Sequence, residues 1–328
     1  SIRCRPANIG AKMLRRDFLG VCGLVVSGRI SFAQSVPIIG FLGAASENLY
    51  GERLKALRSA LARSGYAEGS YKLVLRFADG QINKLTSLAG DIVGAGASVI
   101  VAAGDPAAKA AQQVTAKLPI VFLGGNDPIR IGLVRSLSHP GANVTGVTSL
   151  NVEVTPKRIE ILKEIIGVKK FVVVLHPEGN PAFNRQKSEV EAAVRNLGLQ
   201  AELVYANNKQ EMQSAFAKRL PVVVGPSALF NLESAYLGNL AETFGVPAVF
   251  QTRDFAAAGG LVSYGSDISA QYGLGGEYVA KILKGEKPDA LPVIQATKVE
   301  MIVNLKIAKR LNVEIPVTLL GRADEVIE

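Results

Sequence analysis

The chain has 328 residues, of which 48% are hydrophobic and 20% are charged, so it can bury a large core and is long enough for two lobes of ordinary domain size. This composition excludes a disordered or low-complexity protein. The chain has a net charge of +9, and a positive net charge is common in proteins that bind nucleic acids. However, six basic residues and only one acidic residue precede residue 34. Much of the excess positive charge therefore belongs to one N-terminal segment, and the rest of the chain gives little reason to expect a nucleic-acid partner.

The first 33 residues have the layout of an export signal. Arg15 and Arg16 precede an apolar stretch over residues 18–26, and a small residue, Ala33, ends the segment. The apolar stretch is too short to span a bilayer, which takes about 20 residues. We predict export to the periplasm with cleavage near Ala33, either by the general secretory route or by the twin-arginine route, whose signal the arginine pair resembles. The alternative is a buried N-terminal helix, which the charges and glycines of the segment fit poorly.

The same segment holds both cysteines of the chain. Cys22 does not fit a lipid attachment site, because Val21 precedes it where a small residue is required. A mature chain that begins at residue 34 carries no cysteine, which suits an oxidising compartment. We interpret residues 1–12 as an over-extended start, because Met13 is a plausible initiator. No later stretch is apolar over about 18 residues, the length typical of a membrane span.

From residue 37 onward, short apolar runs rich in β-branched residues alternate with helical patterns, which predicts parallel sheets covered by helices on both faces. In the first half, the predicted strands are 37–43, 71–77, 98–104, 119–125 and 143–149, and the predicted helices lie near 49–64, 82–94, 106–116 and 129–138. In the second half, the predicted strands are 169–177, 199–206, 221–227 and 247–251, and the predicted helices lie near 182–197, 209–219 and 229–244.

Between the halves, residues 155–167 predict an amphipathic helix. Thr155 is the expected cap, Pro156 the first helical residue and Gly167 the stop signal. The halves on either side have similar length and rhythm. We therefore predict an α/β fold with two Rossmann-like lobes, each built on a parallel sheet.

Four loops that follow predicted strands carry capping residues, prolines and glycines. Their sequences are "VAAGDPAAKA", "FLGGNDPIRIG", "VLHPEGNPAFN" and "VVGPSALFN". In open α/β sheets, ligands bind beyond the carboxyl ends of the strands, where helix N-termini offer free N–H groups. The loops therefore predict a site for a small polar or anionic group. The alternative is that each loop serves only as a turn, as every strand–helix connection needs such residues.

The sequence contains none of the usual catalytic signatures, since it has no GxGxxG after a strand, no GxxxxGK[ST], no GxSxG and no HExxH. Its two histidines, His139 and His176, share no metal-ligand spacing. Ser227 has no base that the sequence reveals. We therefore expect a binding protein rather than an enzyme, with no cofactor and no bound metal.

Five stretches of the chain are distinctive, namely "PIVFLGGNDPIRIGLVRSLSHPGANVTGVTSL" (119–150), "KRIEILKEI", "VPAVFQTRDFAAAGGLVSYGSDI" (246–268), "YVAKILKGEKPDALPVIQATKVEMIVNLKIAKRLNVEIP" (278–316) and "LLGRADEVIE" at the C-terminus. In these stretches the chain resembles the family of ABC transporter substrate-binding proteins, including the tryptophan- and tyrosine-binding type, which has the type 1 periplasmic binding-protein fold. The resemblance implies two lobes joined by three crossovers, a ligand in the cleft between them, hinge closure, and delivery to a permease that works with a cytoplasmic ATPase.

The resemblance and the strand ends together define expected lobes and ligand-binding residues. Lobe one is expected over 34–150 and lobe two over 151–267, with 268–328 returning to pack largely on lobe one. The expected ligand-binding residues are Ser46, Glu47, Gly104, Asp105, Gly125, Asn126, Asp127, Thr148, Asn180, Ser227, Phe230, Gln251, Arg253, Asp254 and Tyr264.

Hydroxyl groups and helix N-termini would receive a carboxylate, Asp254 or Glu47 would receive an ammonium, and Phe230 or Tyr264 would cover an apolar portion. The chain departs from the binders of aromatic amino acids in two ways. The loop after the first strand shows no obvious aromatic clamp, and the sequence contains no tryptophan. Branched-chain or aromatic amino acids, aromatic acids and small amides therefore all stay open as solutes.

Three other classes of protein compete with a transport protein as the function of this chain. An α/β enzyme would need a nucleophile or base that the sequence does not reveal. A sugar-responsive repressor would need an N-terminal helix-turn-helix, where this chain has an export signal. A ligand-sensing protein that feeds a membrane receptor would bind and close in the same way as a transport protein, so the sequence does not separate the two.

Overall fold

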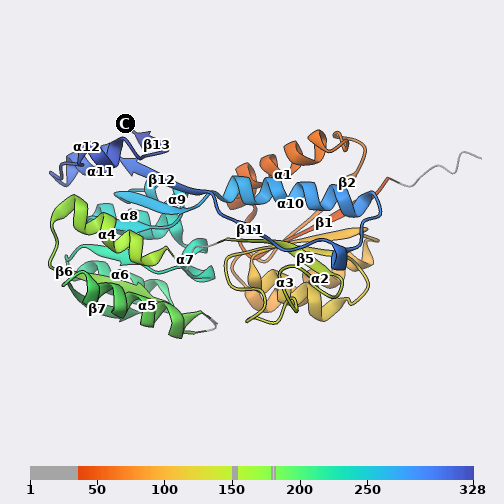
Figure 1. Cartoon of the computed structure of the whole chain (residues 1–328), viewed down its shortest axis with the longest axis horizontal. Coiled ribbons are helices and arrows are strands. Elements are labelled where there is room, and N and C mark those ends of the chain that lie inside the picture. Colours follow the sequence, from red (N-terminus) through yellow and green to blue (C-terminus); the bar gives the residue numbers. More distant parts are fainter. Residues whose placement is uncertain (1–35, 150–153, 179, 181) are drawn as a thin grey trace, which may run out of the picture. The chain divides into compact units, whose positions relative to one another are not determined.

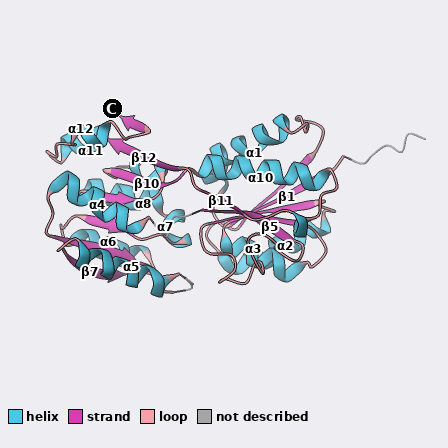
Figure 2. Ribbon diagram, viewed as in Figure 1, coloured by secondary structure: helices cyan, strands magenta, loops and turns pink. Residues whose placement is uncertain are grey.

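Two mostly parallel sheets, each covered by helices on both faces, make up the described part of the chain (Figures 1 and 2). The structure is a computed structural model that describes residues 36–149, 154–178, 180 and 182–328. The predicted export signal over residues 1–33 lies outside these described residues. Residues 36–328 form one compact unit. No helix among the described residues is both long and apolar enough to cross a membrane.

The first sheet has six parallel strands in the order β11-β5-β4-β3-β1-β2. They are β1 (Ile38–Gly43), β2 (Lys72–Phe77), β3 (Val99–Ala103), β4 (Ile120–Gly124), β5 (Val144–Ser149) and β11 (Ile294–Ala296). Every residue of β3 and β4 is buried, as expected for central strands of a sheet covered on both faces. One face packs on α1 (Gly51–Arg63) and α10 (Ile268–Leu283), which lie side by side, and the other on α2 (Leu85–Gly94) and α3 (Asp105–Val114).

The second sheet has seven strands in the order β13-β12-β10-β9-β8-β6-β7. They are β6 (Lys170–Leu175), β7 (Gln200–Tyr205), β8 (Val222–Val224), β9 (Ala248–Phe250), β10 (Val262–Ser266), β12 (Val299–Asn304) and β13 (Glu325–Ile327). One face packs on α4 (Thr155–Ile166), α5 (Phe183–Asn196), α11 (Leu305–Arg310) and α12 (Val317–Leu320). The other packs on α6 (Lys209–Ala217), α7 (Ala228–Leu232), α8 (Ser234–Phe244) and α9 (Arg253–Ala257).

The prediction of two α/β lobes is confirmed, but the C-terminal segment differs from what we expected. The chain passes between the sheets three times, after β5, after β10 and after β11. Of the segment 268–328, α10 and β11 pack on the first lobe, whereas everything from β12 onward belongs to the second. The reason is that β12 pairs antiparallel with β10, which buries Met301 and Val303 in the second core.

Two predicted helices also differ. Residues 129–138 form turns, because the single turn that starts after Asp127 ends at Gly132, whose φ of +67° is in the left-handed region. The helix predicted near 229–244 is divided at Glu233 into α7 and α8. At the start of α4, Thr155 is the first helical residue and no side chain caps the helix, while Gly167 ends it in the left-handed conformation as predicted.

Short 3-10 helices complete the connections. They are η1 (Glu47–Tyr50), η2 (Ile82–Lys84) and η3 (Pro288–Ala290). The first of these matters for the site, because it joins the end of β1 to α1 and places Tyr50 in the core beside Phe41, with their ring centroids 5.2 Å apart.

Candidate functional site

A cavity of about 130 Å³ lies between the carboxyl ends of strands of the first sheet and elements of the second lobe. This volume is many times the roughly 10–15 Å³ that one water molecule requires, so the cavity can hold a small solute. Its lining residues are Ala44, Ala45, Leu49, Tyr50, Arg53, Ala103, Gly104, Asp105, Pro106, Leu123, Gly124, Gly125, Asn126, Ser149, Pro226, Ser227, Ala228, Asn231, Leu232, Gln251, Ile268, Gln271 and Tyr272.

Asp105 supplies a carboxylate at the bottom of the cavity. It is the first residue of α3, and Gly104 before it has a φ of +103°, a conformation that favours glycine. Its Oδ2 accepts hydrogen bonds from the backbone N–H of Asn126 at 3.2 Å, from that of Gly125 at 3.4 Å and from Asn126 Nδ2 at 2.6 Å. Its Oδ1 is shielded from solvent and accepts no hydrogen bond from the described residues. The carboxylate therefore has one oxygen fixed by the protein and one left for another donor.

The environment of this carboxylate also affects its protonation. Burial raises the pKa of Asp105, and the hydrogen bonds from Asn126 and Gly125 only partly offset that effect. Gly124 allows the close approach, because a Cβ atom at that position would lie 2.1 Å from Asp105 Oδ1. A cationic partner placed in the cavity would lower the pKa again and stabilise the ionised carboxylate.

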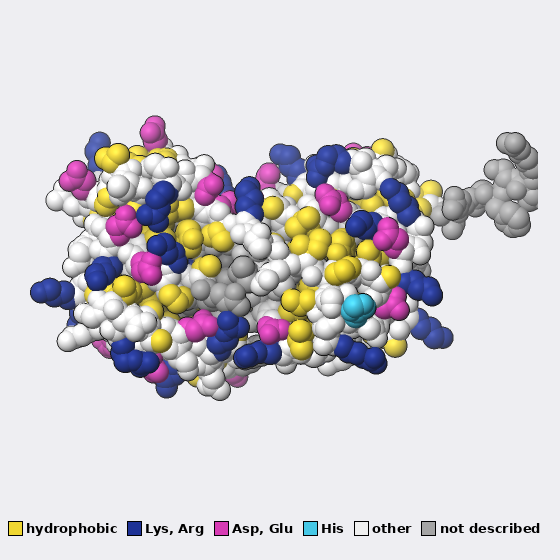
Figure 3. Space-filling model, in the orientation of Figure 1, with side chains coloured by type: hydrophobic (Ala, Val, Ile, Leu, Met, Phe, Trp, Pro, Cys, Tyr) yellow, Lys and Arg dark blue, Asp and Glu magenta, His cyan; other side chains and the backbone are white. Residues whose placement is uncertain are grey.

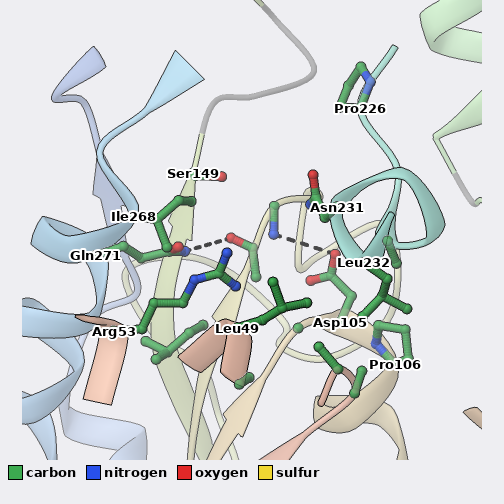
Figure 4. Close-up of a pocket in the computed structure, with 18 of the residues that line it drawn as sticks. Leu49, Arg53, Asp105, Pro106, Ser149, Pro226, Asn231, Leu232, Ile268 and Gln271 are labelled. Carbon is green, nitrogen blue, oxygen red and sulfur yellow. Dashed lines mark hydrogen bonds between the residues drawn. The ribbon is translucent and has the colours of Figure 1, made fainter. Parts of the chain in front are cut away.

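Arg53 supplies a cation to the same cavity (Figure 4). It lies in the first turn of α1, and its guanidinium carbon is 5.6 Å from the centroid of the Tyr50 ring. The hydroxyl of Tyr50 accepts a hydrogen bond from the backbone N–H of Ala45 at 3.1 Å, which fixes the ring. Burial acts to lower the pKa of Arg53, but Tyr272, Asp254 and Tyr50 outweigh this effect and raise it. Arg53 is therefore a permanent positive charge at the cavity.

The second lobe closes the cavity with α7 and the end of β9. Ser227 caps α7, since its Oγ accepts a hydrogen bond from the backbone N–H of Phe230 at 2.9 Å. Gln251 follows β9 and donates a hydrogen bond through Nε2 to Asn231 Oδ1. Its Oε1 is buried and has no partner among the described residues. Two residues that line the same cavity, one from each lobe, therefore each have a buried acceptor without a partner among the described residues.

Helix α10 and apolar side chains complete the walls. Gln271 donates to the carbonyl oxygens of Gly124 at 2.7 Å and Val147 at 3.0 Å, so it anchors α10 to the ends of β4 and β5. Leu49 and Leu232 add aliphatic surface from opposite lobes (Figure 4). The cavity thus combines a cation, a carboxylate and apolar walls, which suits a small solute that carries both charges and an apolar portion.

Six of the residues expected from the sequence line this cavity. They are Gly104, Asp105, Gly125, Asn126, Ser227 and Gln251. Asp127 and Thr148 instead line a second cavity of about 150 Å³, which adjoins the first through Gly125, Asn126 and Ser149. There, Asp127 accepts a hydrogen bond from the backbone N–H of Ile129 at 2.9 Å, and Thr148 donates to the carbonyl oxygen of Asn126 at 2.8 Å.

The other expected residues lie outside the first cavity. Ser46 and Glu47 are in the connection between β1 and α1, and Glu47 is exposed. Asn180 accepts a hydrogen bond from the backbone N–H of Ala182 at 3.1 Å, as in a turn. The ring of Phe230 is fully buried in the core of the second lobe, so it packs there and does not cover the cavity.

Three of these residues belong to the second lobe near β10. Arg253 forms an ion pair with Glu325 at 2.5 Å. Asp254 forms an ion pair with Arg53 at 3.2 Å. Tyr264 packs against the second core, and its carbonyl oxygen accepts a hydrogen bond from Arg158 Nε at 2.7 Å.

Sequence reasoning missed several residues of the cavity, chiefly Arg53, Tyr50, Gln271 and Tyr272. One signal could have revealed Arg53, because a basic residue in the first turn of a helix opposes the helix dipole. Gln271 and Tyr272 lie near the start of α10, which follows β10, a strand that the sequence analysis did not predict, so no expected strand end pointed to them.

The described residues form no metal cluster, and one face of the molecule shows no basic stripe. Within residues 36–149, 154–178, 180 and 182–328, no cluster of three or more His, Cys, Asp or Glu side chains could hold a metal ion. On the face shown in Figure 3, basic and acidic side chains are interspersed. Such mixing does not form the basic stripe that a nucleic-acid backbone requires.

The chain is similar in sequence and in fold to known binding proteins. Residues 45–327 match a family model described as ABC transporter substrate binding protein. A tyrosine-binding protein of Clostridioides difficile is 24% identical over 271 residues, which cover 79% of this chain and 76% of the relative. The crystal structure of an ABC domain in complex with L-Trp from Streptococcus pneumonia is 25% identical, with a TM-score of 0.80 over 89% of this chain and 100% of that chain. A periplasmic binding protein/LacI transcriptional regulator from Alkaliphilus metalliredigens, complexed with D-xylulofuranose, is 13% identical and shares the fold, with a TM-score of 0.54 over 81% of this chain and 97% of that chain.

Proposed function

Because the chain belongs to the family of ABC transporter substrate-binding proteins, we propose that it captures an L-amino acid outside the cytoplasm and delivers it to a membrane permease driven by an ATPase. One observation carries the choice of solute, namely that Arg53 and the free oxygen of Asp105 lie in one cavity. An amino acid at neutral pH carries the two charges that complement this pair.

In this proposal the carboxylate of the solute pairs with Arg53. A guanidinium offers five N–H donors, and Arg53 donates to Asp254 through Nη2. The ammonium of the solute donates to Asp105 Oδ1 and to Gln251 Oε1, the two buried acceptors that otherwise have no partner. Each unpaired buried acceptor costs roughly 1–3 kcal/mol, so a solute that satisfies both recovers part of that free energy.

The side chain of the solute then faces the apolar walls. Leu49, Leu232 and Ile268 surround the charged groups with aliphatic surface. Among the described residues, no further charged side chain lines this cavity, which favours an apolar over a charged amino acid. The L-Trp complex and the tyrosine-binding relative support this class of solute, while the aliphatic walls also suit a branched-chain side chain.

Direct titration tests the proposal. The protein is partly unfolded and refolded to remove any carried solute, and is then titrated with L-tryptophan, L-tyrosine and L-leucine, with glucose as a control. Because the sequence contains no tryptophan, excitation that tyrosine does not absorb excites only the added L-tryptophan, whose emission changes when it is bound. Energy transfer from the tyrosines of the protein, of which Tyr50 and Tyr272 line the cavity, is a second signal of binding. A refolded protein that unfolds cooperatively but binds no amino acid would refute the proposal.

A second measurement concerns the partner. Cells that lack the protein should lose uptake of the amino acid that it binds, and uptake should return with the wild-type chain. Normal uptake by such cells, with amino-acid binding intact, would instead assign the protein to ligand sensing through a membrane receptor.

A further inference from the structure

One ion pair joins the two lobes beside the cavity. Arg53 Nη2 in α1, on the first sheet, lies 3.2 Å from Asp254 Oδ2 in α9, on the second. The other ion pairs between described residues lie within one lobe, except Lys298–Asp267, which connects two of the crossovers themselves. The Arg53 side chain is only 18% exposed and that of Asp254 is 43% exposed. The pair is therefore partly shielded from water and from salt.

The two partners differ in their access to a solute. Arg53 lines the cavity and is held from its own lobe by the ring of Tyr50. Asp254 does not line the cavity, and its described contact in this region is with the guanidinium of Arg53. Any effect of Asp254 on a solute in the cavity therefore passes through Arg53.

We propose that Asp254 is a positioning residue and that the Arg53–Asp254 ion pair is a latch that holds the lobes closed over the solute. This inference rests on the proposed function, since the guanidinium that binds the carboxylate of the solute is the one that reaches the opposite lobe. A single side chain thus contacts the solute and joins the lobes, so that occupancy of the cavity and closure stabilise each other.

The latch predicts a kinetic signature. An interaction that exists only when the lobes meet stabilises the closed state, and the solute leaves after the lobes separate. Its loss should raise the dissociation rate constant and leave the association rate constant nearly unchanged. Because Asp254 is partly exposed, the expected rise in the dissociation rate is modest, about two- to tenfold.

The experiment compares Asp254→Asn, Asp254→Glu and the wild type by stopped-flow measurement with the amino acid that binds. Asp254→Asn should dissociate about two- to tenfold faster at low salt. The difference in dissociation rate constant between this variant and the wild type should become smaller as the salt concentration is raised, because salt screens a partly exposed ion pair. Asp254→Glu keeps the charge and should largely restore slow dissociation. Glu325→Gln, which removes the ion pair with Arg253 within the second lobe, is the matched control and should dissociate like the wild type.

The chemistry of the ligand separates a latch from a direct contact. If Asp254 acts through Arg53, Asp254→Asn should lower the affinity for the amino acid and the affinity for its deaminated carboxylic acid by the same factor. A loss confined to ligands that carry an ammonium would show that Asp254 touches the solute and would overturn the proposal. A wild-type dissociation rate in Asp254→Asn at low salt would overturn it as well.

The latch and the proposed function can fail separately. If the wild type binds no amino acid, the proposed function fails, but the latch can still be tested with fluorescent labels on cysteines introduced at exposed sites, one on each lobe. The described residues contain no native cysteine to interfere. Asp254→Asn should then show a larger average separation of the lobes than the wild type, and an unchanged separation would refute the latch.

Discussion

Replacing Asp105 by asparagine tests the site most directly. The asparagine side chain can still accept the hydrogen bonds from the N–H groups of Gly125 and Asn126, so the loop after β4 should keep its shape. The other oxygen, Oδ1, which has no partner among the described residues, becomes an NH₂ group, which repels an ammonium. A hydrogen bond to a charged group is worth about 1.5–3 kcal/mol. The affinity for the amino acid should therefore fall by roughly 10- to 150-fold.

The measurement is isothermal titration of the wild type and of Asp105→Asn with two ligands, the amino acid that binds and its deaminated carboxylic acid. The variant should lose affinity for the first but bind the second at least as well as the wild type, because a carboxylate no longer faces it. Asp289→Asn removes an exposed carboxylate in η3, far from the cavity lining, and should change neither affinity. Equal losses for both ligands, or none, would refute the assignment of Asp105 to the ammonium.

Three further predictions concern packing and charge. Gly124→Ala would place a Cβ atom 2.1 Å from Asp105 Oδ1, so it should weaken amino-acid binding at least as much as Asp105→Asn, measured by the same titration. Burial and the nearby charge of Asp267 raise the pKa of Glu300 from 4.5 to about 7, so its ionisation costs stability as the pH rises through that range. Glu300→Gln should thus raise the unfolding midpoint in urea above about pH 7 and leave it unchanged below about pH 4.5, whereas a shift that is equal at both pH values would contradict this reasoning. Arg158 is fully buried and donates to a backbone carbonyl, so Arg158→Ala should cost about 2–5 kcal/mol of unfolding free energy in urea, and a loss under about 1 kcal/mol would contradict that role.

The sequence predicted β1 to β9 and part of the site for a clear physical reason, whereas β10 to β13 were not predicted. Central parallel strands are buried on both faces, so they appear as short apolar runs, and the loops after them carry the residues that fit a turn, a cap and a ligand. Asp105, Asn126, Ser227 and Gln251 all follow such strands and all line the cavity. The segment 129–138 forms turns, but its sequence predicts a helix because Asp127 and Pro128 also suit a helix start.

The rest of the site depends on long-range packing. Gln271 contacts the carbonyl of Gly124, which is 147 positions earlier in the chain, and nothing local marks that meeting. Asp254 follows a strand as the ligand-binding candidates do, yet it lies beside Arg53, 201 positions away, and outside the cavity. Local patterns report which residues end a strand, whereas the packing of α1 and α10 decides which side chains from helices join them.

The three passages of the chain between the sheets also determine when each lobe can fold. The first sheet is complete only when β11 and α10 have been made, and the second only when β12 and β13 at the far C-terminus have been made. During synthesis, both lobes therefore stay incomplete until most of the chain has been made, and contacts this distant in sequence form slowly. A chain that stops before β12 would leave β10 as an unpaired edge next to an apolar core, so truncated products of this protein should be prone to aggregation and degradation.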